Sequence, residues 1–454
     1  MLIDFEVENF RSFGERRVFS MLANSKIQDH KDHIAPADRL QSGLLRAAVM
    51  YGANAAGKSN LIRAVDFAAR TIHSLPEEGR PIPVRPFGTA EFADKESTFQ
   101  FRFLARGNVF TYGFALTAKR INSEWLAVWD GEKDEDIYSR EGDAFEANQH
   151  LSGSSFEEVD ITLDSLEALN HLGVRPNQLL LSKLLDLRED KRGSLINAMA
   201  WWFQECLVIV YPNANYTGLL KDLESDPEFL RFAEVFLETV DTGIASLNIE
   251  HTPLDADDLP QALVQDLESQ AEIRFPGSTV SLSLNPEKPT EVIRRNISAK
   301  HALGAEGFQL PMDEESDGTR RILELLPALY LMRNQCGVFL IDELDRSLHP
   351  ELSKAFIQFF LESCPKSCRQ LIVTTHELHL LDQSLLRRDE IWLVEKNESQ
   401  QTELSSLSNI ESRKDRKLAK NYLEGRFGGV PHIRDTKKLK DIIDCEVLPN
   451  GADA

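Results

Sequence analysis

Residues 52–59 read GANAAGKS, and this segment constrains the fold of the chain more than any other. It follows the apolar run LLRAAVM, which is typical of a buried strand, and precedes NLIRAVDFAARTI, whose apolar residues recur at helical spacing. A strand, a glycine-containing turn and a helix are the context of a phosphate-binding loop, whose main-chain N–H groups and helix N-terminus attract anions. We therefore expect Lys58 to reach the β- and γ-phosphates of a nucleotide and Ser59 to bind Mg²⁺. The nucleotide-binding residues predicted in this segment are Gly52, Asn54, Ala55, Ala56, Gly57, Lys58, Ser59 and Asn60.

A second apolar run, near the other end of the chain, supplies the acidic residues that complete such a site. Residues 338–345 read VFLIDELD, so a strand is expected to deliver Asp342 to the carboxyl edge of a sheet, where ligands bind in α/β folds. Asp342 can hold Mg²⁺ through water, together with Ser59. Glu343 is then placed to orient and deprotonate an attacking water molecule, which makes it the predicted general base.

Two shorter features flank the acidic strand. Residues 314–321 read EESDGTRR, and Ser316, Gly318 and the start of the helix that follows form a second predicted anion site. The segment TTHE places His376 at the end of the next strand, where its imidazole can contact a γ-phosphate. The predicted catalytic residues are therefore Glu343, His376 and Lys58.

The patterns along the chain predict an α/β protein with three parts. Residues 1–150 combine the phosphate loop with alternating runs typical of β-strands. Residues 151–300 are predicted to form a mainly helical insertion, a possible partner or dimer surface, although STVSLSLNP and TEVIRRNIS can be strands. Residues 301–454 alternate strands and helices, which indicates a parallel sheet covered by helices.

The order of these motifs resembles that of the ABC-type ATPase heads of the SMC, RecF and double-strand-break-repair kind. The resemblance implies a two-lobed α/β head with mixed and parallel sheets, which binds ATP and Mg²⁺ and hydrolyses ATP. It also implies that Ser316 and Gly318 form the signature turn and act on the nucleotide of the opposite subunit. Asp345, in ELDRSLHP, matches the D-loop, which also acts in trans, and His376 matches the switch histidine.

The same resemblance assigns residues outside the central motifs. The opening segment NFRSF is similar to the first strand of those heads, where Arg11 and Ser12 lie near the nucleotide. A glutamine of the Q-loop binds the metal ion in these families. We assign it to Gln178, in RPNQLLLSKLLDL, and Gln100 is the other candidate.

Within this superfamily, the chain is most similar to the AAA/ABC ATPases of bacterial anti-phage systems, of the abortive-infection, RloA, Septu and OLD-related kind. The resemblance rests on NFRSF, YGANAAGKSNLIRA, ESDGTRR, LIDELDRSLHP, TTHE and the late segment SRKDRKLAKNYLEGRFGGVPHI. It implies a homodimer or higher homo-oligomer that senses infection and controls a separately encoded effector, a nuclease or toxin. DNA or a phage component is a possible further partner. The alternative is a RecF- or SMC-like repair ATPase that clamps DNA.

Two departures from these families limit the function. No sustained heptad run is present, so no coiled-coil arm of SMC length is expected. The residues after His376 are too few for the TOPRIM nuclease domain that OLD nucleases carry there. We therefore expect the chain to be an ATPase without a nuclease site of its own.

The composition of the chain indicates which partners and which cellular location to expect. The formal net charge is −22, which argues against general coating of nucleic acid. Residues 411–440 concentrate positive charge and form either a surface for DNA or an acidic partner, or a solvated helix. The five cysteines show no disulfide or metal framework and are expected to be reduced thiols. No signal peptide and no apolar run approaching ~18 residues is seen, so we expect a soluble, cytoplasmic protein without membrane contact.

Overall fold

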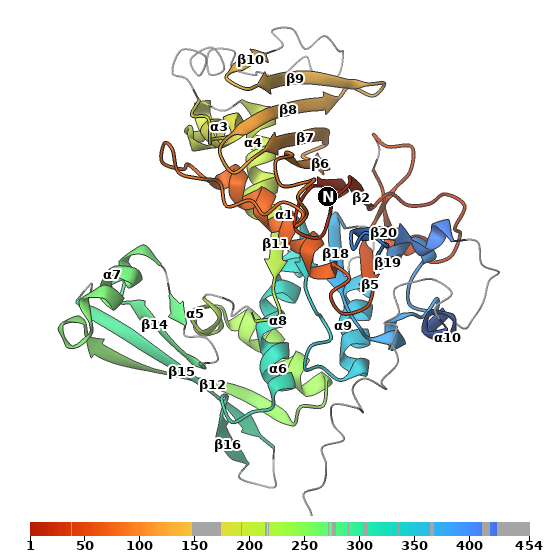
Figure 1. Cartoon of the computed structure of the whole chain (residues 1–454). Helices are drawn as coiled ribbons and strands as arrows, with labels where there is room; N and C mark the ends of the chain where they lie inside the picture. Colours follow the sequence, from red (N-terminus) through yellow and green to blue (C-terminus); the bar gives the residue numbers. More distant parts are fainter. Residues whose placement is uncertain are drawn as a thin grey trace, which may run out of the picture.

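A computed structural model shows an α/β chain built around two large sheets, with a smaller five-stranded sheet beside them (Figure 1). A two-stranded sheet pairs β3 (Ile34–Ala35) with β4 (Leu44–Leu45). It describes the whole chain except residues 38, 148–173, 192, 214, 215, 217, 271, 275–277, 289, 303–306, 335, 364–366, 411–417 and 425–454. Residues 151–173 of the predicted helical insertion and most of the basic segment 411–440 lie outside the described residues. In the described part of the chain, no helix is both long and apolar enough to cross a membrane.

The first sheet has seven antiparallel strands in the order β10-β9-β8-β7-β6-β1-β2. Its strands are β1 (Leu2–Glu8), β2 (Arg17–Ser20), β6 (Ser97–Ala105), β7 (Asn108–Leu116), β8 (Ile121–Trp129), β9 (Asp134–Glu141) and β10 (Ala144–Ala147). In β6 every second residue is buried, which is the pattern of a strand with one face against a core. Two short helices, α3 (Leu180–Asp186) and α4 (Ser194–Trp201), contribute their apolar residues to the core of this sheet.

The second sheet has six strands in the order β11-β17-β18-β5-β19-β20, and only β20 runs antiparallel to its neighbour. Its strands are β5 (Ala47–Tyr51), β11 (Leu207–Val210), β17 (Gly337–Ile341), β18 (Arg369–Thr374), β19 (Ile391–Lys396) and β20 (Thr402–Ser406). The parallel arrangement predicted for the C-terminal region is confirmed. Because β5 lies between β18 and β19, the N-terminal phosphate loop belongs to the same sheet as the C-terminal motifs.

Helix α1 (Lys58–His73) lies between the two large sheets (Figure 1). Its buried residues share one core with β6 and β7 and with Leu340 and Ile372 of the six-stranded sheet. The opposite face of that sheet, including Phe339 and Ile341, packs against α8 (Asp317–Asn334) and α9 (Pro350–Glu362). Side chains of successive strand residues point to opposite faces, so each central strand contributes to both cores.

The third sheet corrects the prediction for residues 151–300. Before residue 240, the described part of this region is mainly helical, with β11 as its one regular strand, and it ends with α5 (Leu219–Ser225) and α6 (Pro227–Thr239). After them, β12 (Ile244–Asp255), β13 (Ile273–Arg274), β14 (Val280–Leu284), β15 (Glu291–His301) and β16 (Phe308–Pro311) form a five-stranded antiparallel sheet beside α7 (Gln261–Ser269). The two runs interpreted as possible strands are β14 and β15. The helical description missed β12, whose exposed polar residues hide the strand alternation.

A disulfide between Cys336 and Cys368 contradicts the expectation of reduced thiols. The two cysteines immediately precede β17 and β18, and the first residues of these strands, Gly337 and Arg369, are paired in parallel. Strand pairing therefore brings their Cα atoms to 5.1 Å, within the range of a disulfide. Their separation of 32 residues gave no sign of this contact in the sequence.

Gln370 links the two large sheets through their main chains. Its side chain is fully buried, accepts a hydrogen bond from Leu2 N (2.6 Å) and donates to Leu2 O (2.9 Å) and Leu45 O (3.0 Å). Three main-chain groups of two other segments thus depend on one side-chain amide for their hydrogen bonds.

We expect Gln370→Leu to lower the free energy of unfolding by about 3 kcal/mol or more, because each buried main-chain group left unpaired costs about 1–3 kcal/mol. Urea denaturation of the full chain measures this change. Gln261→Leu makes the same replacement at an exposed position and should change the stability by less than about 0.5 kcal/mol. Equal effects of the two variants would show that the amide does not link the sheets.

Candidate functional site

The turn between β5 and α1 has the backbone of a phosphate-binding loop. Ala55 and Gly57 have positive φ angles, 63° and 116°. A Cβ atom on Gly57 would lie 2.1 Å from Oγ1 of Thr402, so only glycine fits this position. Asn54 and Ala55 are exposed at the tip of the turn, whereas Gly52, Ala56 and Gly57 are buried beneath it. The tip is therefore the part of the loop that is open to a ligand.

Lys58 begins α1 and folds back over the turn. Its Nζ donates to Gly52 O (2.7 Å) and Ala53 O (3.3 Å) and lies 3.5 Å from Nδ1 of His376. Burial lowers the pKa of Lys58 to about 8, although the carboxylates of Asp345, Asp342 and Glu343 act in the opposite direction. The ammonium group is thus held at the carboxyl edge of the sheet among three acidic residues.

Asp342 lies at the point where three parallel strands end. Its Oδ1 accepts hydrogen bonds from Ser59 Oγ (3.0 Å) and Thr374 Oγ1 (2.6 Å), and its N–H donates to Val210 O (2.9 Å). These contacts join the ends of β11, β17 and β18 to the first turn of α1. A serine hydroxyl beside a carboxylate offers the hard oxygen ligands that Mg²⁺ prefers, so this pair fits the expected metal ion.

Glu343 follows Asp342 with an unusual backbone. Its φ angle is 51°, in the left-handed region, and its N–H donates to Thr374 Oγ1 (2.8 Å). Non-glycine residues rarely adopt this conformation, which costs free energy and occurs often at functional sites. The turn directs the chain away from the strand directly after Asp342, and the side chain of Glu343 remains partly exposed.

His376 and Asp345 lie on the same edge of the sheet. The N–H of His376 donates to Oδ2 of Asp345 (3.1 Å), and the imidazole is exposed beside Lys58. Desolvation and the nearby ammonium of Lys58 lower the pKa of His376, so its ring is neutral at pH 7. Asp345, expected to act in trans, therefore also contacts the site of its own chain.

Ser12 lies next to the phosphate loop, and Arg11 precedes it in the chain. Ser12 Oγ accepts hydrogen bonds from Asn60 Nδ2 (2.8 Å) and Thr402 Oγ1 (2.7 Å). Arg11 also has a positive φ angle, 53°, and desolvation together with Arg63 and Arg85 lowers its pKa. Three cations that lie close enough to interact suit a polyanionic ligand.

Ser316 and Gly318 are at the start of α8. Oγ of Ser316 accepts from Thr319 N (3.1 Å), and a Cβ atom on Gly318 would lie 2.8 Å from Ser347 O. Among the described residues, no hydrogen bond of Ser316 reaches the phosphate loop of the same chain. The turn therefore packs on the segment that follows the acidic strand, and the hydrogen bonds found for Ser316 in the described residues are to Thr319.

The structure places Gln178 away from this site, which corrects its assignment as a metal ligand. Its neighbour Asn177 donates to Glu77 O (2.7 Å) and Arg80 O (2.9 Å), in the chain that follows the C-terminus of α1. A helix of 16 residues separates that end from Ser59 by roughly 20 Å. The alternative, Gln100, lies in β6, and its Oε1 accepts from Trp125 Nε1 (3.0 Å).

Three features of the site were missed in the sequence. Thr374 supports both Asp342 and the main chain of Glu343, and Thr402 bonds to Ala56 O (2.7 Å). The segment after β11 begins with Tyr211 beside Asp342, and Arg321 of α8 donates to Tyr211 O (3.3 Å). In the sequence, β11 is indicated by the short apolar run LVIV, which lies just before Tyr211 and a proline. Such a run does not show which strands it pairs with, so its place beside Asp342 could not be predicted.

The comparison with known families agrees with this geometry. Residues 47–168 and 208–382, well over half of the chain, match the model of a family described as "AAA domain, putative AbiEii toxin, Type IV TA system". The chain belongs to this family. The match includes the phosphate loop, Ser316, Asp342, Glu343 and His376.

Solved structures with a similar arrangement include two SMC heads. The SMC head domain from Thermotoga maritima has 12% sequence identity and a TM-score of 0.37, and the match covers 90% of this chain and 99% of that one. A structure of the SmcHead bound to the C-winged helix domain of ScpA has 14% identity and a TM-score of 0.35, with 89% and 97% covered. No curated protein matches this chain. The family assignment rests on the family model and the site geometry.

The burial of Lys58 gives a testable titration. After methylation of the lysines with ¹³C-formaldehyde, NMR should show one lysine titrating near pH 8, far below the usual 10.5, and Lys58→Arg should remove that signal. Protonated Lys58 opposes folding below about pH 8, and this destabilisation is lost as the pH rises toward 10.5.

Asp345→Asn should lower the pKa of Lys58 further, because the Asp345 carboxylate is the largest influence that favours the ammonium form. Asp257→Asn, in an exposed turn beside α7, is the matched control and should leave the titration unchanged. A Lys58 signal that titrates together with the exposed lysines would contradict the burial of this amine.

Proposed function

We propose that this chain binds and hydrolyses ATP. The observation that carries the proposal is the hydrogen bond between Ser59 of the phosphate loop and Asp342 of the acidic strand. It joins the two halves of a nucleotide site across a separation of 283 residues, in a chain of the AAA family. An ordinary glycine-rich turn has no reason to meet a buried carboxylate, whereas a nucleotide site requires this meeting.

The polar residues at the carboxyl edge of the six-stranded sheet then each have a role in the proposed reaction. Lys58 and the main-chain N–H groups of residues 52–59 bind the phosphates of ATP. Ser59 and Asp342 would hold Mg²⁺, which neutralises charge on the phosphates. Glu343 accepts a proton from the attacking water, and His376, neutral at pH 7, contacts the γ-phosphate.

We infer that two copies complete each site. Ser316 and Gly318 form a helix start suited to an anion, yet their described contacts are with Thr319 and Ser347 and none is with the phosphate loop. A head-to-head homodimer would place this turn, and Asp345, against the nucleotide of the opposite copy. ATP would then favour the closed dimer and hydrolysis would release it.

The biological role proposed for this cycle is control of a separately encoded effector in a bacterial anti-phage system. The name of the family refers to a toxin of a toxin–antitoxin system, which supports a partner protein. An ATP-dependent dimer changes state without acting on a macromolecular substrate, which suits a sensor and scaffold. A nuclease or toxin is the proposed effector, and DNA clamping in repair is the competing function.

Glu343→Gln should reduce ATP hydrolysis by about 10²- to 10⁴-fold, because it removes the proposed general base. The binding of ATP should be retained, since Lys58, Ser59 and Asp342 are unchanged. Phosphate release measures the first effect and equilibrium binding of a fluorescent ATP analogue measures the second. Glu398→Gln makes the same replacement in an exposed turn and should leave both unchanged. Hydrolysis at the rate of the unmodified chain in Glu343→Gln would contradict the assignment.

The biological role is tested by purification of the chain with the proteins encoded beside it. Native mass is measured with ATP for the unmodified chain, Glu343→Gln and Glu398→Gln. We expect Glu343→Gln, which binds ATP without hydrolysing it, to be at least dimeric. It should bind a nuclease or toxin encoded beside the chain, and the activity of that protein should change in this variant. A chain that binds no neighbour but holds duplex DNA, with the steep salt dependence of phosphate contacts, would contradict the sensor role and favour repair.

A further inference from the structure

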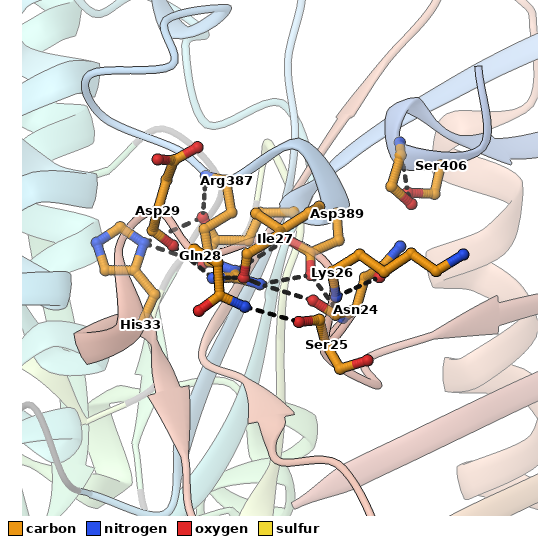
Figure 2. A network of polar contacts seen from close by, with 12 residues as sticks. Asn24, Ser25, Lys26, Ile27, Gln28, Asp29, His33, Arg387, Asp389 and Ser406 are labelled. Carbon is orange, nitrogen blue, oxygen red and sulfur yellow. Dashed lines mark hydrogen bonds and ion pairs between the residues drawn. The ribbon is translucent and has the colours of Figure 1, made fainter. Parts of the chain in front are cut away.

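The loop that follows β2 is held by a buried ion pair just before β19. Arg387 binds Asp389 through Nε (2.9 Å) and Nη2 (2.8 Å), and both side chains are buried. Around this pair, Figure 2 shows the loop from Asn24 to Asp29, whose carbonyl groups accept hydrogen bonds from Arg387. Asn24 N in turn donates to Asp389 Oδ2 (2.7 Å). The loop is thereby fixed against the segment that precedes β19.

The next residues of the same loop bring two imidazoles and a carboxylate together. One ligand atom from each of His30, Asp32 and His33 lies within 4.8 Å of the others. The two rings stack with their centroids 4.7 Å apart, and Asp32 Oδ2 lies 4.0 Å from Nε2 of His33. His30 has a positive φ angle, 46°, which turns the chain so that His30 and His33 are adjacent.

A second set of hydrogen bonds orients both imidazoles. Nδ1 of His33 lies 3.1 Å from both carboxylate oxygens of Glu390, which is fully buried. Nε2 of His30 lies 2.8 Å from the carbonyl oxygen of Gln383. A carbonyl oxygen only accepts, so Nε2 of His30 carries the proton in this contact and its Nδ1 keeps a lone pair. A proton on Nδ1 of His33, toward Glu390, likewise leaves a lone pair on Nε2, the nitrogen near Asp32. Histidines that bind metal ions are held in the same way.

The cluster faces a cavity of about 370 Å³. Besides the three clustered residues, Gln358, Glu362 and Ser384 line it and offer further oxygen atoms. The cation of Lys354 also lines the cavity, but its Nζ lies 3.7 Å from Asp382 Oδ2, which offsets its charge. The cavity therefore has room for an ion and its remaining ligands.

We propose that His30, Asp32 and His33 bind one divalent transition-metal ion of the Zn²⁺ class. Two imidazoles and one carboxylate are ligands that suit Zn²⁺, and Mg²⁺ prefers oxygen ligands, so this site differs in chemistry from that of Ser59 and Asp342. Bonds of about 2.0–2.1 Å require the ligand atoms to come closer than 4.8 Å. Asp32 is exposed, so rotation of its side chain can bring its carboxylate closer to the imidazole nitrogens.

The bound ion strengthens the attachment of the loop to the core. His33 and Glu390 already join the loop to the short helix Arg388–Glu390, which leads directly into β19. β19 pairs in parallel with β5, the strand that carries the phosphate loop. An ion at this site would therefore stabilise the start of β19, the neighbour of β5 in the six-stranded sheet, and removal of the ion would loosen the loop without removing the nucleotide residues.

Titration of the metal-free full chain with Co²⁺ tests the proposal, with excess Mg²⁺ present to occupy the oxygen-ligand site. We expect one Co²⁺ per chain with the visible absorption of a tetrahedral nitrogen–oxygen site, displaced by Zn²⁺, together with a higher melting temperature. His30→Asn, which tolerates the left-handed backbone, and Asp32→Asn should each weaken binding at least tenfold. Glu390→Gln should weaken it about 10- to 100-fold through the lost orientation of His33.

His251→Asn and Asp257→Asn are matched controls at exposed positions and should bind Co²⁺ as the unmodified chain does. Melting curves recorded with a chelator verify that each variant is folded, and Asp32→Asn keeps the test decisive because its side chain is exposed. Absence of Co²⁺ binding in the unmodified chain, or binding that both His30→Asn and Asp32→Asn retain, would overturn the proposal.

Discussion

The parallel pairing of β18 with β17 on one side and β5 on the other is the constraint on which the site depends. Parallel strands that lie side by side end at the same edge, so the phosphate loop, Asp342 and Thr374 must meet there. Asp342 then accepts hydrogen bonds from Ser59 and Thr374 at once, one from each neighbouring element. Without this strand order the same residues would lie on separate parts of the molecule.

The elements packed on both faces of the six-stranded sheet fix the geometry of its carboxyl edge. Helix α1 is buried on several sides between two sheets, so the first turn that carries Lys58 and Ser59 cannot shift independently of the core. Gln370 joins the main chains of the two sheets, and Thr402 closes the phosphate loop against Ser12. Packing of this kind holds the main chain of the loop in one conformation, so less conformational entropy is lost when a ligand binds to it.

The charges at the edge suit a protein that changes state with its nucleotide. Lys58 is buried with a lowered pKa, and its amine donates to the carbonyls of its own loop. A phosphate group would replace these contacts and favour the ammonium form. Asp345 contacts His376 in the same chain, and a second copy would compete for this aspartate in the proposed dimer. Binding of ATP and dimer closure would then involve the same few residues, which is the coupling that the proposed sensor role requires.

The sequence by itself determined the parts of this protein whose chemistry is local. A glycine-rich turn before Lys58 and Ser59, an apolar run before Asp342 and Glu343, and the alternation of strands and helices each depend on neighbouring residues. Only the tertiary structure decided which residues that are distant in the sequence lie next to each other. It placed Gln178 near the far end of α1, paired Cys336 with Cys368, added Thr374 to the site and set Glu390 behind His33. Such contacts depend on strand order and on the packing of segments far apart in the chain, which spacing along the sequence does not encode.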